Sequence, residues 1–164
     1  MKTTIRRVTE VEVEALIDIR LEALKNHPVA FSADYEKELE RPIEEWHKRV
    51  AESVVFIAWD GNSAAGMAGF FGGRSSKTNH HGDIWGVYVR PAYRGQGLGD
   101  RLVMRCLQHA RDDDFTMVYI AAASSNTAAI RCYARCGFSV YGLQPMAVCV
   151  DGEYYDELLM AQRL

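Results

Sequence analysis

The stretch of the chain that decides its fold is Val87-Tyr88-Val89-Arg90-Pro91-Ala92-Tyr93-Arg94-Gly95-Gln96-Gly97-Leu98-Gly99. An apolar strand leads here into three glycines at alternate positions, and the glycines open a predicted helix. Glycine lets the backbone approach a ligand closely, and the first N–H groups of a helix have no partner within it. These donors, together with the positive end of the helix dipole, favour a bound anion. We therefore interpret the junction as a phosphate or pyrophosphate site, because a tight turn alone would need only one glycine.

Two nucleotide-binding motifs also place glycines between a strand and a helix, and neither matches. A dinucleotide fold has the pattern G-x-G-x-x-G, but Asp100 stands where the third glycine is needed. A P-loop requires Gly-Lys-Ser/Thr, which the chain lacks. The pattern that fits is R-x-x-G-x-G, formed by Arg94, Gly97 and Gly99.

The hydrophobic periodicity on both sides of this junction predicts a mixed α/β fold of one sheet with flanking helices, not a regular strand–helix alternation. A Thr9-x-x-Glu12 capping box precedes the first helix, which should end before Pro28. The predicted helices cover 13–24, 42–50, 98–110 and 127–136, and the predicted strands cover 54–59, 65–71, 84–89, 117–122, 146–150 and 153–164. Neither a repeat nor a linker interrupts the chain, so we expect a single domain over residues 1–164.

Composition excludes several classes of protein. The chain has 164 residues, 48% hydrophobic and 25% charged, which excludes disorder and coiled coil for the whole chain. A net charge of −3 argues against broad binding of nucleic acid, and no apolar run approaches the roughly 18 residues that span a bilayer. Residues Met1 to Val8 lack the apolar segment of a secretory signal, and the four cysteines form no C-x-x-C pair. We therefore expect free thiols and a cytoplasmic protein without nucleic-acid or membrane partners.

Three motifs in order resemble the GCN5-related N-acetyltransferase (GNAT) family. They are the R-x-x-G-x-G loop, the pattern Asn126-x-x-Ala129-x-x-x-Tyr133-x-x-x-Gly137-Phe138, and the ending Asp151-Gly152-Glu153-Tyr154-Tyr155-Asp156-Glu157-Leu158-Leu159-Met160. The order of elements agrees over essentially the whole chain. The resemblance implies a mixed, mostly antiparallel sheet with a splayed central strand pair and flanking helices. It also implies an enzyme, an acetyl-CoA-dependent N-acetyltransferase with acetyl-CoA as cosubstrate.

The resemblance assigns the cofactor contacts residue by residue. The loop amides would hold the pyrophosphate of coenzyme A, the strand before the loop would pair with pantetheine, and a residue at the start of the next motif would contact the cofactor. The cofactor-binding residues implied are Val87, Tyr88, Val89, Arg94, Gly95, Gln96, Gly97, Leu98, Gly99, Asp100 and Asn126.

For catalysis, the resemblance places Tyr133 near the cofactor sulfur, where it would protonate the departing thiolate. Asn126 and Tyr133 are close to two helical turns apart, so both should face one cleft. Asp83 matches the position of the general base, acting directly or through water, although His80 or His81 could substitute for it. The alternatives are a half-buried aromatic side chain at Tyr133 and a solvated carboxylate at Asp83.

We expect direct attack of a primary amine on the thioester, because no cysteine occupies a defined position of the glycine loop or of the Asn126–Phe138 motif as a nucleophile. The N–H of Val87 is the expected donor to the carbonyl oxygen. His80, His81 and Asp83 lie close in sequence, but adjacent histidines in a loop rarely bind one ion, so we predict no metal site.

The acceptor amine is open between a small molecule and a protein lysine or N-terminus. Candidate acceptor residues are Phe31, Tyr35, Trp46 and Tyr155, with Glu36, Glu38, Glu40 or Asp156 to attract a cationic amine. The mild overall acidity would help to draw such an amine in. Two other functions remain: a catalytically silent acyl-CoA-binding or regulatory module, and a protein-interaction domain without cofactor. A homodimer is an expectation by resemblance only.

Overall fold

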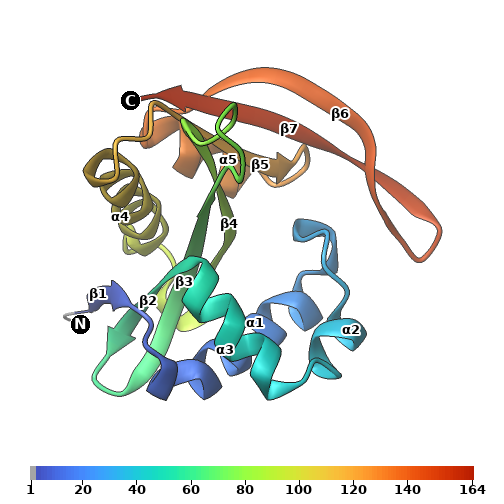
Figure 1. Cartoon of the computed structure of the whole chain (residues 1–164). Coiled ribbons are helices and arrows are strands. Elements are labelled where there is room, and N and C mark those ends of the chain that lie inside the picture. The colour runs from blue at the N-terminus through green and yellow to red at the C-terminus, as the bar shows by residue number, and fades with distance from the viewer. Residues whose placement is uncertain (1–2) are drawn as a thin grey trace.

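The computed structural model describes residues 3–164, so Met1 and Lys2 of the N-terminal segment considered above lie outside the described residues. Within residues 3–164, seven strands form one sheet in the order β1-β2-β3-β4-β5-β7-β6 (Figure 1). The strands are β1 (Thr4–Arg7), β2 (Val54–Asp60), β3 (Ser63–Gly72), β4 (His81–Val89), β5 (Met117–Ala123), β6 (Ser139–Val150) and β7 (Glu153–Arg163). Among them, β4 and β5 are the only parallel neighbours. The predicted mixed, mostly antiparallel fold is confirmed.

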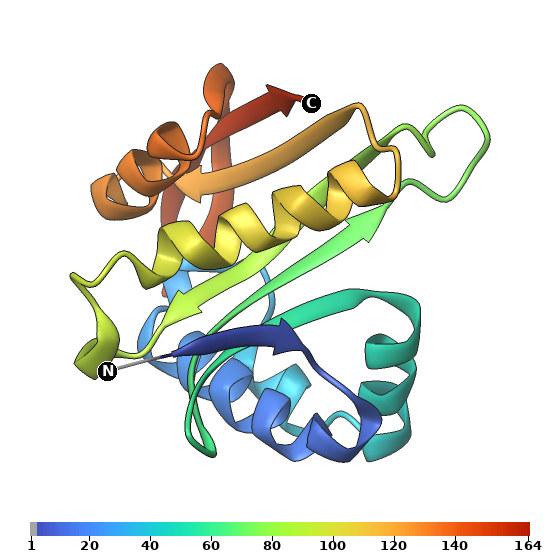
Figure 2. The ribbon, with the colours of Figure 1, turned by 90° about the vertical axis from the view of Figure 1, so that its left-hand side faces the viewer.

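Helices cover both faces of this sheet. The helix α4 (Leu98–Asp112) lies across one face, as Figure 2 shows, with α5 (Thr127–Arg135) beside it. The helices α1 (Val13–Asn26), α2 (Tyr35–Leu39) and α3 (Ile43–Glu52) gather at the other face. Short 3₁₀ turns at Glu10–Glu12, Pro28–Ala30 and Pro91–Tyr93 join these elements.

Each face of the sheet has its own buried apolar cluster. The cluster under α4 and α5 includes Phe56, Phe70, Leu102, Leu107, Val118 and Met160. The cluster under α1 and α3 includes Leu16, Ile19, Trp46, Ile57, Met67 and Tyr88. The apolar periodicity that predicted the helices therefore corresponds to the stripes that they bury.

Most predicted elements are confirmed, and three differ. The short helix α2 lies outside the predicted helices, because the sequence around Tyr35 shows no clear apolar period. The strand β1 was not predicted, because two of its four residues are arginines and it pairs only with β2 at the edge of the sheet. The strand β6 begins at Ser139 rather than at 146, since its first half is exposed and shows no alternation of apolar side chains. Gly137 follows α5 with φ of +98°, the left-handed conformation in which a glycine commonly ends a helix.

The splay at the centre of the sheet is the feature that creates a site. β4 and β5 pair only from His81 with Met117 to Asp83 with Tyr119. Beyond these pairs the two strands separate, while each keeps its other neighbour, β3 or β7 (Figure 1). The inner edges of β4 and β5 therefore keep main-chain groups that no strand occupies.

A β-bulge changes the direction of side chains in the splayed part of β4. Between the pairs Gly69–Trp85 and Met67–Tyr88, β3 has one residue and β4 has two, Gly86 and Val87. Gly86 has φ of +63°, a left-handed conformation that favours glycine. The extra residue lets Trp85 and Tyr88 both pack toward the α1 face, while Val87 packs toward α4.

Candidate active site

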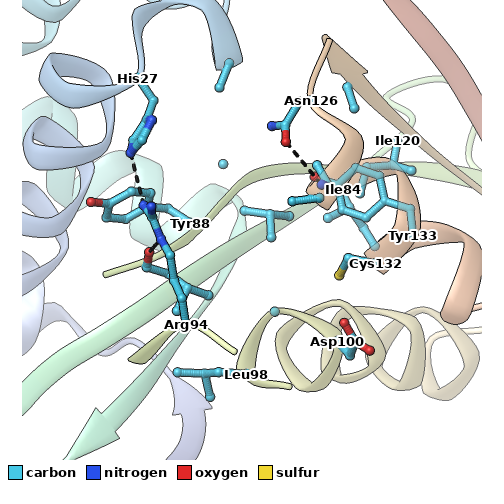
Figure 3. Close-up of a pocket in the computed structure, with 18 of the residues that line it drawn as sticks. His27, Ile84, Tyr88, Arg94, Leu98, Asp100, Ile120, Asn126, Cys132 and Tyr133 are labelled. Atoms are coloured by element: carbon cyan, nitrogen blue, oxygen red, sulfur yellow. Dashed lines mark hydrogen bonds between the residues drawn. The ribbon is translucent and has the colours of Figure 1, made fainter. Parts of the chain in front are cut away.

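A cleft of about 480 Å³ lies where the two central strands separate (Figure 3). On β4 its lining begins at Ile84 and on β5 at Ile120, the residues that follow the last parallel pair. The start of α4 and the inner side of α5 complete the walls. The splay itself thus opens the cleft.

The glycine loop presents unoccupied main-chain donors to this cleft. Gly95 and Gly97 have φ of +74° and +71°, and no heavy atom lies within 4 Å of where a Cβ would stand. Gly97 is the N-cap of α4 and has no side chain to cap it. The first helical bond at this end runs from the Arg101 N–H to the Gly97 carbonyl at 3.1 Å. The preceding amides are therefore free to bind an anion.

Most of the predicted cofactor residues meet in the cleft. Its lining includes Val87, Tyr88, Val89, Arg94, Gly95, Gly97, Leu98, Gly99, Asp100 and Asn126. Gln96 is the predicted cofactor residue that does not line it. The structure thus brings together residues of a strand, a loop and two helices that are separate in sequence.

Arg94 is fixed beside the glycine loop. Its Nε donates to the Val89 carbonyl at 2.9 Å, and its Nη2 lies 3.0 Å from the His27 Nε2 (Figure 3). Burial and the Arg94 charge lower the pKa of His27, so the imidazole is neutral and accepts from the guanidinium. The pairing orients a cation at the mouth of the cleft without neutralising it.

The acidic residue of the loop does not oppose an anion there. Asp100 accepts two hydrogen bonds from Arg135, at 2.7 and 2.8 Å. The Arg135 guanidinium holds the pKa of Asp100 below its usual range, so the pair is charged and compensated. Arg135 also lines the cleft and was not identified from the sequence.

Asn126 and Tyr133 lie on the same side of the cleft, as their spacing predicted (Figure 3). Asn126 is the N-cap of α5, and its Oδ1 accepts from the Ala129 N–H at 3.1 Å. Tyr133 is 6% exposed, and burial raises the pKa of its phenol. The phenol therefore keeps its proton across the physiological range and can act as a donor.

The cysteine in the cleft is protonated. A hydrogen bond with Cys136 and burial raise the pKa of Cys132, whose side chain lines the cleft beside Tyr133. The thiol is a poor nucleophile in that state. Cys106, Cys132, Cys136 and Cys149 are all free.

Asp83 lies at the vertex of the splay and outside the lining of the cleft. It belongs to the last parallel pair, opposite Tyr119, and the lining begins at the next residue. Burial raises its pKa, and the neighbouring His81 lowers it in part. The His81 ring packs against Tyr119 at 5.2 Å and against His80 at 5.1 Å. The role of Asp83 as a base stays a prediction.

The acceptor candidates divide into those near the cleft and those in the core. Phe31 lines the cleft, whereas Trp46 is buried between α3 and the sheet. Glu38 is 4% exposed and accepts from Arg49 and Arg41, so it offers no free carboxylate to a cationic amine. Asp156 accepts from the Met146 N–H at 2.8 Å.

Residues 3–164 contain neither a metal-ligand cluster nor a membrane-spanning helix. In that range no three histidine, cysteine, aspartate or glutamate side chains come together as metal ligands. None of the helices in it has the length and apolar character needed to cross a membrane.

Residues 16–138 match the family model described as Acetyltransferase (GNAT) family, and the chain belongs to this family. L-amino acid N-acyltransferase MnaT of Escherichia coli K12 is 27% identical over 117 residues, which are 71% of this chain and 68% of that protein. Mycothiol acetyltransferase of Corynebacterium glutamicum strain R is 33% identical over 96 residues, 58% of this chain. The aligned part is 30% of that relative, so the chain spans a minor share of its length.

Solved structures agree with the fold. The structure of yncA from Salmonella typhimurium with its cofactor acetyl-CoA has a TM-score of 0.83 and 25% identity, and covers 100% of this chain and 95% of its own. A GNAT-family acetyltransferase from Streptococcus pneumoniae has a TM-score of 0.88 at 19% identity. The match covers 99% of this chain and 100% of the Streptococcus chain. The second likeness shows the fold alone.

Proposed function

We propose that the protein is an acetyl-CoA-dependent N-acetyltransferase that moves the acetyl group to a primary amine by direct attack. The observation that carries this proposal is the arrangement of the cleft, in which free helix-start amides and a buried neutral phenol line one opening in a splayed sheet. Membership of the acetyltransferase family and the likeness to yncA, whose structure contains acetyl-CoA, support it.

The residues present fit coenzyme A. Glycines without a Cβ leave the loop open, and the free amides at the start of α4 suit a pyrophosphate, with Arg94 as an adjacent cation. No strand pairs with the inner edge of β4 from Val87 to Val89, where the Val89 carbonyl accepts from Arg94, and this edge suits main-chain pairing with the amides of pantetheine. When bound, acetyl-CoA supplies a thioester as the acyl donor.

In this proposal the chain's own groups perform three tasks. The Val87 N–H at the bulge would donate to the acetyl carbonyl oxygen, where a fixed donor stabilises developing negative charge. A base, for which Asp83 at the vertex of the splay is the candidate, takes the proton that the attacking amine must lose. The Tyr133 hydroxyl donates its proton to the departing sulfur. The protonated state of Cys132 supports transfer without an acetyl-enzyme.

For the acceptor we propose a small molecule rather than a protein amine. The names of relatives support this choice: one is an L-methionine sulfoximine/L-methionine sulfone acetyltransferase of Salmonella typhimurium, 29% identical over 110 residues, and another is the L-amino acid N-acyltransferase MnaT. A homodimer stays a prediction.

The test is the variant Tyr133→Phe, assayed for release of coenzyme A with a panel of amines and peptides. We expect turnover to fall about 10²- to 10⁴-fold, the typical contribution of a positioned proton donor. Affinity for acetyl-CoA, measured by calorimetry, should change little because the ring remains. The control is Tyr154→Phe, at a tyrosine 61% exposed on β7, which should keep full turnover.

Other outcomes are equally informative. Unchanged turnover in Tyr133→Phe would overturn the assigned role of the phenol. Acetyl-CoA binding without turnover over the whole panel would favour the silent binding module, and absence of binding would favour an interaction domain.

A further inference from the structure

Arg20 on α1 is a buried cation. Its side chain is 6% exposed, and neither its Nε nor its Nη1 has a partner among residues 3–164. Burying a charge without a partner is costly, and most buried polar groups are paired. Burial lowers the pKa of Arg20 to about 10, so the guanidinium is still charged near neutral pH. The site is therefore short of an anion.

Two aromatic rings lie beside this guanidinium. Its Cζ lies 5.2 Å from the centre of the Phe31 ring and 5.4 Å from that of Trp85. Gly69 holds the Trp85 indole in place, because a Cβ at this glycine would lie 2.2 Å from the ring. Both distances are within the range of a cation–π contact, and the planar fork of guanidinium N–H donors matches a planar anion.

The charge of the nearby Glu38 raises the pKa of Arg20 in part, but its oxygens hydrogen-bond other arginines. Both oxygens of Glu38 are occupied, by Arg49 at 2.8 and 3.0 Å and by Arg41 at 3.2 Å. Arg41 also binds Glu45 at 2.6 Å. Of the residues that the structure describes, five cationic and three acidic side chains line the cavity around Arg20. The cavity thus has an excess of positive charge in a chain whose net charge is −3.

This second cavity, of about 800 Å³, adjoins the cleft at the β4 bulge. Trp85 lines both spaces, and Phe31 and Gly86 line the cleft. The Arg20 Nη1 lies 3.4 Å from where a Cβ of Gly86 would stand. An anion on Arg20 would therefore sit next to the residue that precedes Val87, the proposed donor to the acetyl carbonyl.

The helix that carries Arg20 is held to the same strand. Glu22, two residues further on, accepts from the Tyr88 hydroxyl at 2.9 Å and from the Arg90 Nε at 2.8 Å. These bonds fix α1 against β4, so the distance between the guanidinium and the bulge is set by the fold. A fixed cation beside a fixed oxyanion donor is suited to select a substrate by the distance between its anionic group and its amine.

We propose that Arg20 binds a carboxylate of the acceptor and that the acceptor is a small amino acid-like amine, with acid and amine separated by few bonds. This inference rests on the proposed function, because it places the amine at the bulge for acetyl transfer. Phe31 and Trp85 would flank the bound carboxylate and exclude water from it, which strengthens a charge-assisted hydrogen bond.

The experiment compares three forms of the same compound: L-leucine, L-methionine or L-phenylalanine, its carboxamide, and the corresponding amine without the carboxyl group. Initial rates of coenzyme A release give kcat/KM for each. In the wild type we expect the free acid to exceed the carboxamide about tenfold to hundredfold, the effect of a hydrogen bond to a charged group. In Arg20→Met this ratio should fall to near one, because kcat/KM falls for the free acid and stays unchanged for the carboxamide.

Two controls separate this role from a structural one. Lys48→Gln removes a cation from the exposed rim of the same cavity, where it pairs with Glu52 at 3.7 Å, and should keep the preference for the acid. The melting temperature of Arg20→Met should equal or exceed that of the wild type, because the variant removes an unpaired buried charge. Arg20→Lys should show an intermediate preference, since it keeps the charge without the planar fork.

The outcomes distinguish the two proposals. Acetylation of amines with no preference for the acid, or a preference that survives in Arg20→Met, would overturn the inference and leave the proposed function standing. If acetyl-CoA binds but no amine reacts, the proposed function fails. Calorimetry of L-leucine on the CoA-bound protein then decides about Arg20: binding that is lost in Arg20→Met supports the carboxylate site, and no binding by the wild type overturns it.

Discussion

Replacing Gly97 by alanine tests whether the glycine loop is the pyrophosphate site. This residue is the N-cap of α4 and has φ of +71°, where alanine is strained by about 1–2 kcal/mol. No atom lies within 4 Å of the new Cβ, so the substitution adds strain without a clash. The lower entropy of the unfolded alanine chain offsets about 0.4–1 kcal/mol of the strain. We expect a net loss of about 1 kcal/mol and a melting temperature lower by roughly 2–4 °C.

The effect on the ligand should be larger than the effect on stability. The empty space beside Gly97 is the space that an anion on the α4 amides would approach, and the new methyl group would stand there. Loss of one charge-assisted hydrogen bond corresponds to about 1.5–3 kcal/mol. Calorimetry with coenzyme A should therefore show a Kd raised by roughly tenfold to more than a hundredfold.

Gly61 provides a matched control. It lies in the turn between β2 and β3, has φ of +58°, and likewise has no atom within 4 Å of a would-be Cβ. Gly61→Ala should lower the melting temperature by a similar amount and leave the Kd for coenzyme A unchanged. If Gly97→Ala also leaves this Kd unchanged while stability falls, the loop does not hold the pyrophosphate and the cofactor assignment is wrong.

Two further substitutions test the buried charge and the base. Glu38→Gln should lower the free energy of unfolding in urea at pH 7 by about 3 kcal/mol, because it removes the carboxylate that pairs with Arg49 and one of the two that pair with Arg41. Burial alone would raise the pKa of Glu38, but Arg49 lowers it below 4.5. The stability that the ionised Glu38 contributes is therefore present above about pH 4.5 and is lost as the pH falls. An equal loss of stability in the exposed Glu36→Gln would contradict this assignment. Asp83→Asn should lower kcat/KM for the amine about 10²-fold or more without changing the affinity for acetyl-CoA. In the wild type, kcat/KM should fall at low pH as Asp83, whose pKa is raised, becomes protonated, and this fall should be absent in Asp83→Asn. The exposed Asp112→Asn serves as control, and an unchanged profile in Asp83→Asn would move the base to His80, His81 or water.

The predictable part of the fold is the part in which apolar residues repeat with the period of one element. The helices and the buried strands satisfy this condition, and glycines mark the turns between them. The strand β1 does not, because Arg6 lies on the Trp59 ring at 4.7 Å and pairs with Glu12, so a charged residue takes the place of an apolar one. The first half of β6 is exposed and carries no burial signal at all.

The site was predictable only where a motif defines it. The glycine loop, Asn126 and Tyr133 have fixed spacings, whereas Arg20 occupies one position in an amphipathic helix with nothing in the sequence to distinguish it from a solvated arginine. Its burial depends on Trp85, whose direction depends on the bulge at Gly86 and on the lack of a side chain at Gly69. The burial of Arg20 thus depends on three residues far from it in the sequence, and the periodicity of its own helix cannot predict it.

The charge of the site also differs from the charge of the chain, and this bears on the substrate. A net charge of −3 suggests attraction for a cationic amine, but the exposed carboxylates that produce it are screened beyond about 8–10 Å. Next to the bulge, the ligand meets Arg20, while Glu38, the nearby buried acid, is already bound to Arg49 and Arg41. A polyamine would bring a second cation against an unpaired buried guanidinium, where repulsion is least screened. A zwitterion brings its carboxylate to that guanidinium and its amine to the bulge, so the local charge favours an amino acid over a polyamine.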